Sequence, residues 1–257
     1  MNAISKVTIL SLVAAGQFAL ATPAAAVTEI FASYLPTAAG SNMRYQKTGL
    51  NDGLIYTVSS STSVALGSTA VRFSFIGGPL ASLGILDASF VFSGIATDNP
   101  ALSLGGLLIQ SLDSGFFGFT YTGLTPLHVG SATYTTGSNL LSGSFSGGQI
   151  FGTASGSSGS ITASTPPTTA VQYTSDFRTF DPLADKDFAL ALTAITPFLV
   201  RVNPDSSINS FRAVSTGAFS TELGAMVPEP RVWGLFVVGF GLVGVRLRRR
   251  DTKVAVC

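Results

Sequence analysis

The chain has 257 residues and a formal net charge of +1, with 46% hydrophobic and only 11% charged residues. Residues 27–226 hold seven basic and eleven acidic side chains, a net charge of −4, which argues against nucleic-acid binding. The single cysteine, Cys257, rules out an internal disulfide or a cysteine-based zinc site, and the single histidine, His128, makes a hydrolytic enzyme less expected. We therefore expect a non-enzymatic protein without a cofactor.

Residues 1–26 have the order of parts that is typical of a secretory signal peptide. Lys6 supplies the positive charge, and an uncharged, mostly apolar run follows at 7–21. Ala24 and Ala26 form the small-x-small cleavage site, so Val27 is the expected mature N-terminus. The alternative is a buried N-terminal helix. The signal peptide predicts that signal peptidase and the secretion machinery act on the chain and that its body is exported.

From residue 27 to about residue 222, short runs alternate apolar with small or polar side chains, which indicates half-buried β-strands. Phe188, Leu190 and Leu192, for example, fall on one face of a single run. The strands are expected at 53–60, 70–78, 86–94, 116–123 and 187–195, with turns at 51–53, 77–79, 98–100 and 203–205. The predicted fold class is all-β, an antiparallel β-sandwich or jelly-roll-like body at 27–226. A parallel β-solenoid is the second choice, although no fixed repeat supports it.

Aromatic residues are frequent in these runs and could line a carbohydrate or partner surface. At strand spacing they more often form the core. The candidates are Tyr45, Tyr56, Phe73, Phe75, Phe90, Phe92, Phe116, Phe117, Phe119 and Tyr121.

His128 is the residue on which a hydrolase would depend. No second histidine is present to share a metal, and no G-x-S-x-G elbow is found, so a spatial catalytic triad is the remaining enzymatic option. An exposed or hydrogen-bonded strand histidine is the favoured interpretation.

The stretch at 141–170 is the most biased, because Ser, Thr and Gly together make up more than half of it. Such a composition is typical of linkers. Phe145, Ile150, Phe151 and Ile161 interrupt it, so we expect two poorly covered strands with a mobile loop near residues 155–160. A division into two β domains at this stretch is the alternative.

Asp181, Asp185 and Asp187 cluster in one segment, with Asp176 nearby. Several carboxylates in one loop could hold calcium, which takes six to eight oxygen ligands. The spacing is not that of an EF-hand, and Lys186 stands inside the cluster. The segment is therefore a weak calcium candidate, and a solvated turn before the strand at Phe188 is favoured.

Near the C-terminus, Gly239, Gly241 and Gly244 match G-x-G-x-x-G. A dinucleotide-binding turn also needs a following helix and an acidic residue about 20 positions later, but the sequence ends at Cys257. The glycines instead fall within an uncharged run, 232–245, and we expect a short transmembrane helix at about 232–247. Basic residues follow it as a cytoplasmic stop-transfer signal: Arg246, Arg248, Arg249 and Arg250.

Pro228, Glu229 and Pro230 force an extended segment just before this run, and Trp233 stands near its start. Together with the apolar run and the arginine cluster, residues 227–257 resemble the PEP-CTERM sorting signal in its PEP-x-x-W-A variant, with Gly234 in the place of the alanine. The resemblance is confined to this C-terminal segment. It implies recognition by the membrane enzyme exosortase and processing near the Pro-Glu-Pro segment, after transient anchoring in the inner membrane.

Members of this family are exported proteins of Gram-negative bacteria that make extracellular polysaccharide and biofilm. The resemblance therefore implies a cell-surface or extracellular-matrix location, with a structural or adhesive role and exopolysaccharide as an associated material. A secreted carbohydrate- or calcium-binding module with the same sorting tag is the alternative function.

Overall fold

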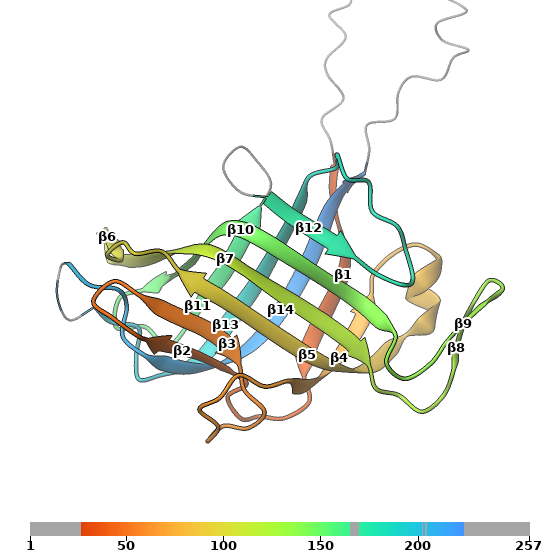
Figure 1. Cartoon of the computed structure of the whole chain (residues 1–257), viewed down its shortest axis with the longest axis horizontal. Helices are drawn as coiled ribbons and strands as arrows, with labels where there is room; N and C mark the ends of the chain where they lie inside the picture. Colours follow the sequence, from red (N-terminus) through yellow and green to blue (C-terminus); the bar gives the residue numbers. More distant parts are fainter. Residues whose placement is uncertain (1–26, 165–169, 202, 204, 224–257) are drawn as a thin grey trace, which may run out of the picture. The chain divides into compact units, whose positions relative to one another are not determined.

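The computed structural model describes residues 27–164, 170–201, 203 and 205–223, and residues 27–223 fall within one compact unit (Figure 1). Strands make up most of it: β1 (Val27–Pro36), β2 (Met43–Lys47), β3 (Gly53–Thr57), β4 (Thr69–Phe75), β5 (Ile85–Ala96), β6 (Leu102–Leu104), β7 (Leu107–Tyr121), β8 (Leu127–Val129), β9 (Ala132–Tyr134), β10 (Asn139–Thr153), β11 (Gly159–Ser164), β12 (Ala170–Thr174), β13 (Lys186–Thr196) and β14 (Phe211–Leu223). A short 3-10 helix, η1 (Pro79–Leu83), lies between β4 and β5.

The strand pairings close into a circuit in the order β1-β4-β5-β7-β10-β11-β13-β14 and back to β1. Strands β2 and β3 join β14 to β5, β12 pairs with β10, β6 pairs with β7, and β8 and β9 form a separate hairpin. Every ladder between the described strands is antiparallel. The predicted all-β antiparallel class is therefore confirmed and is consistent with a β-sandwich, whereas the parallel β-solenoid is wrong.

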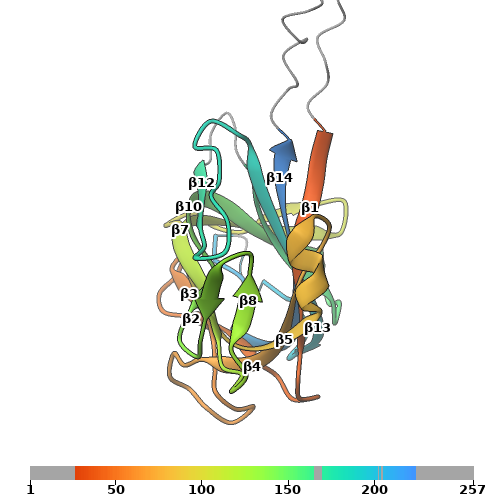
Figure 2. The same cartoon turned by 90° about the vertical axis from the view of Figure 1, so that its right-hand side faces the viewer.

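Two layers enclose the core, with β7, β10 and β12 on one side and β1 and β14 on the other (Figures 1 and 2). Aromatic rings meet between the layers. The ring centroids of Phe117 on β7 and Phe219 on β14 are 5.0 Å apart, and those of Tyr34 on β1 and Phe119 on β7 are 5.1 Å apart. Such tilted contacts add to the stabilisation that comes from burying the rings.

The five strands predicted from alternation are present as β3, β4, β5, the second half of β7, and β13. On β13, Phe188, Leu190 and Leu192 are at most 2% exposed, as the alternation predicts. The first half of β7 was missed, because the inward position at its centre is the polar Gln110. Its side chain is buried and donates a hydrogen bond to the Asn99 carbonyl, while its oxygen accepts one from the Ile208 N–H.

The Gly/Ser/Thr-rich stretch forms β10 and β11, which confirms two strands at this place. The expectation that they are poorly covered is wrong, because Phe145, Ile150 and Ile161 are at most 3% exposed. The glycines permit close packing: a Cβ added at Gly143 would lie 2.5 Å from the Gln172 carbonyl oxygen and 2.6 Å from the Phe117 ring. The small residues of this stretch therefore allow neighbouring strands and rings to approach.

Candidate functional site

The predicted sorting and processing residues fall outside the described residues. They are the cleavage positions Ala24 and Ala26, the motif Pro228, Glu229, Pro230 and Trp233, the glycines of the predicted membrane helix, and the arginines Arg246, Arg248, Arg249 and Arg250. Among the described residues, no helix has the length and apolar character needed to cross a membrane.

Nine of the ten candidate aromatic residues are buried. The exception is Phe116, which is 47% exposed on β7. The set therefore belongs to the core and does not form an exposed aromatic surface, because its members alternate inward along their strands.

His128 lies on β8 and is exposed. Its Nδ1 is 3.1 Å from the Thr133 hydroxyl on β9, across the hairpin. This agrees with the expected exposed, hydrogen-bonded strand histidine.

The aspartate cluster is used in local turns. The Asp181 carboxylate accepts a hydrogen bond from the Leu183 N–H at 2.9 Å, and the buried Lys186 ammonium donates to the carbonyls of Asp181 and Ala184 at 2.7 and 2.8 Å. Asp187 is paired with Ser220 in the ladder between β13 and β14. Nowhere in the described ranges do three His, Cys, Asp or Glu side chains come together as a metal site.

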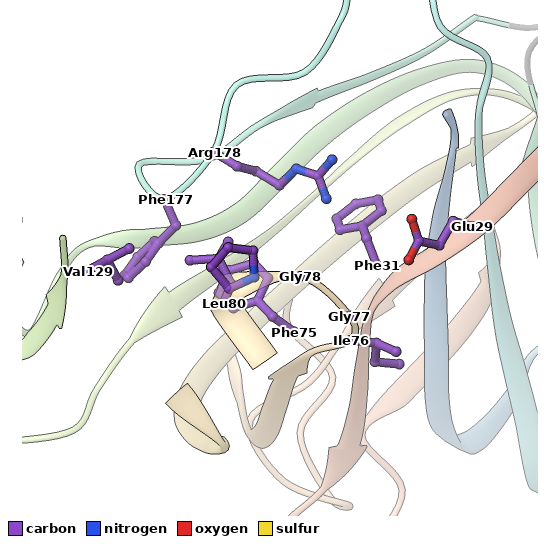
Figure 3. Close-up of a pocket in the computed structure, with 11 residues that line it drawn as sticks. Glu29, Phe31, Phe75, Ile76, Gly77, Gly78, Leu80, Val129, Phe177 and Arg178 are labelled. Carbon is purple, nitrogen blue, oxygen red and sulfur yellow. The ribbon is translucent and has the colours of Figure 1, made fainter. Parts of the chain in front are cut away.

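A cavity of about 360 Å³ lies where three connecting segments meet. These are the turn from β4 into η1, the β8–β9 hairpin, and the loop at 175–185 between β12 and β13. Figure 2 shows the β8–β9 hairpin beside η1, and Figure 3 shows the lining side chains. Apolar groups from Phe31, Phe75, Leu80, Val129 and Phe177 form most of the wall.

Hydrogen bonds fix the loop that carries Phe177 and Arg178. The Asp176 N–H donates to the Asn139 carbonyl at 3.0 Å, and the Asn139 N–H donates back to the Asp176 carboxylate at 2.7 Å. The Tyr134 hydroxyl donates to the Asp176 carbonyl at 3.0 Å, and the Tyr134 ring stacks on Phe177 with centroids 4.0 Å apart. The loop is thereby held to the start of β10 and to β9, which places Phe177 against the cavity.

Arg178 supplies the positive charge of the cavity. Its guanidinium carbon lies 4.8 Å from the ring centroids of both Phe31 and Phe180, a cation–π arrangement. Figure 3 shows the Arg178 and Phe31 side chains. Burial lowers the pKa of the Arg178 guanidinium, and the negative charge of Glu29 acts in the opposite direction.

Glu29 supplies the negative charge. It is an exposed residue on β1, and its side chain borders the cavity beside Gly77 (Figure 3). Gly77 and Gly78 have φ angles of 71° and 61°, which favour glycine, and a Cβ at Gly77 would lie 2.8 Å from the Glu29 Oε1 atom. Glycine at this turn leaves room for the carboxylate.

Of the residues that line the cavity, only Phe75 was among the candidates from the sequence, as one of the aromatic residues. The available signal for the rest was Phe177-Arg178, an aromatic residue next to one of only seven basic residues of the body. The alternation does not extend to these connecting segments, and their meeting depends on the pairing of strands that are far apart in the sequence.

Comparison of the chain with protein-family models, curated proteins and solved structures finds no significant match.

Proposed function

We propose that this protein is an exported, non-enzymatic component of the cell surface or extracellular matrix, sorted by its C-terminal signal and associated with exopolysaccharide. In this proposal signal peptidase removes residues 1–26. Residues 232–245 anchor the chain transiently in the inner membrane, and exosortase then processes it near Pro228-Glu229-Pro230.

One observation supports the proposal most. The described strands begin at Val27 and end at Leu223, between the two expected processing sites. Val27 and Leu223 are also paired across the ladder of β1 and β14. Both cuts would therefore leave each described strand intact, and they would occur close to adjoining strand ends. We interpret this body as a β-sandwich of jelly-roll-like character.

The masses of the mature termini test the proposal. In an exosortase-positive cell, the mature protein is expected to begin at Val27 and to end near residues 228–230. A double variant, Pro228→Ala with Pro230→Ala, is compared with Pro126→Ala as a control to separate sorting from folding, because only the double variant alters the segment that the sequence predicts to be extended. A mature protein that kept residues 232–245 in the inner membrane would overturn the sorting part.

A second candidate function is carbohydrate binding by the exported body, and the cavity at Arg178 favours it over calcium binding. Ligand sites combine a mostly apolar concave wall with a few convergent polar groups, in volumes of roughly 300–1,000 Å³. The cavity of about 360 Å³, with apolar rings, one guanidinium and one carboxylate, has this character. The aspartates at 181–187 offer no comparable group of ligands among the described residues.

A further inference from the structure

The Arg178 side chain is half-buried at the edge of the cavity. Its contacts are the faces of the Phe31 and Phe180 rings. Within the described part of the chain, no carbonyl or carboxylate accepts a hydrogen bond from it, and Glu29 is not in ion-pair contact with it. A guanidinium has five N–H donors in a planar fork that matches a carboxylate, and leaving such donors unpaired as water is removed is unfavourable.

The rest of the cavity adds two requirements. The Phe177 ring, Leu80 and Val129 offer apolar surface to a ligand, so one face of that ligand should be apolar. The Glu29 carboxylate, when ionised, is an acceptor only, so the ligand should bring hydroxyl or amine hydrogens to it. A ligand with a second negative charge on that side would be repelled.

We propose that the cavity binds a uronate, an acidic sugar residue, with Arg178 holding the ring carboxylate and Glu29 accepting hydrogen bonds from the ring hydroxyls. The apolar face of the pyranose ring then packs against Phe177, Leu80 and Val129. This proposal rests on the carbohydrate-binding candidate above and names its substrate class. An aromatic acid would leave Glu29 without donors, whereas a uronate carries the single charge, the hydroxyls and the apolar face together.

Titration calorimetry on the full-length protein tests the proposal with three probes: trigalacturonate, its methyl ester, and galactotriose. The unmodified protein is expected to bind trigalacturonate at least tenfold more tightly than either neutral probe, because charge-assisted hydrogen bonds to Arg178 are lost with them. This comparison requires no mutation, so it stands even if a variant fails to fold.

Variants then test whether Arg178 is the residue that binds the carboxylate of the ligand. Arg178→Gln is expected to weaken trigalacturonate binding about 10- to 100-fold and to remove the preference over the ester. Arg178→Lys keeps the charge and loses the planar fork, so its loss should be intermediate. Arg72→Gln is the matched control, because Arg72 is exposed on β4 and does not line the cavity. Thermal unfolding of each variant shows whether the fold is kept.

Equal affinity for the acid and its ester, or an Arg178→Gln variant that binds like the unmodified protein, would overturn the uronate assignment. Binding of the neutral probes alone would overturn it and leave the carbohydrate-binding candidate standing. Binding of none of the three would overturn both. The export proposal is judged separately, by the termini of the mature chain.

Discussion

Aromatic residues occur both in the interior of the body and at the cavity beside Arg178, but their surroundings differ. In the interior, rings such as Phe90 and Phe119 meet other rings, with stacked centroids 4.5 Å apart. At the cavity, Phe31 and Phe177 are also buried, but they border a hollow that is lined by the side chains of Arg178 and Glu29 as well. Aromatic content alone therefore does not identify a binding site in this chain. The distinguishing feature is a cavity beside the rings that is also lined by a guanidinium and a carboxylate.

The largest expected effect comes from the interior. Phe119→Ala should reduce the free energy of unfolding by about 3–5 kcal/mol, because the side chain is fully buried and packs against rings from β1, β4, β5 and β14. Phe116→Ala is the matched control on the same strand, where the ring is 47% exposed, and should cost far less. Denaturant unfolding measures both. Equal losses of unfolding free energy would contradict the assignment of Phe119 to the core and of Phe116 to the surface.

Alkaline pH should lower the stability of the fold, because tyrosine hydroxyls are buried in the interior. Burial raises the pKa of Tyr45 to about 12 and raises the pKa values of Tyr34 and Tyr173 further, from an ordinary value near 10. The unfolded chain therefore releases these protons first, so stability should be retained below about pH 10 and fall as the pH rises from about 10 to 12. The melting temperature across this range is the measurement. Tyr45→Phe should have a shallower fall, and identical curves would contradict the assignment.

At the cavity, Gly77→Ala should lower stability by about 1–3 kcal/mol, because the residue has a positive φ. It should also weaken ligand binding, since the added Cβ would displace the Glu29 carboxylate. Gly105→Ala is the control: its φ of 58° imposes a similar backbone cost, but nothing lies within 4 Å of its Cβ position. Calorimetry should show weaker ligand binding for Gly77→Ala alone. A similar loss of affinity in both variants would mean that Glu29 does not take part in binding.

The smallest effect is expected from the hydrogen bond that holds the Arg178 loop. Tyr134→Phe removes the bond to the Asp176 carbonyl and should cost about 0.5–1.5 kcal/mol. Tyr56→Phe removes the contacts of a buried hydroxyl with the Val64 carbonyl at 2.7 Å and the Gln46 Oε1 atom at 2.8 Å, away from the cavity. It should therefore cost at least as much stability, while only Tyr134→Phe should speed hydrogen exchange at residues 175–180. Unchanged exchange there would mean that Tyr134 does not position the loop.

The difference between the interior and the cavity also explains which features could be predicted from the sequence. Alternation on β13 predicted its buried face, because period 2 is a local property of a strand. It missed the first half of β7, where Gln110 takes an inward position that only its distant partners, Asn99 and Ile208, make acceptable. Turn residues at 77–79 predicted a turn, but not that Gly77 would border the Glu29 carboxylate from β1.

The cavity could not be predicted from the sequence for a related reason. Glu29, Gly77, Val129 and Arg178 come from four separate parts of the sequence. They meet because β1 pairs with β4 and because Tyr134, on the β8–β9 hairpin, contacts the loop that carries Arg178. A lone arginine beside a phenylalanine is common in sequences. Its significance comes from the cavity that it lines, which is a property of the folded chain.

Hydrogen–deuterium exchange of the full-length protein, with and without saturating trigalacturonate, tests most directly whether the cavity is the binding site. We predict slower exchange in residues 76–84, 127–134 and 175–180, which supply the connecting segments around Arg178, and unchanged exchange in the strands of the interior. Protection on the outer face of β13 and β14, with none in these three segments, would contradict it.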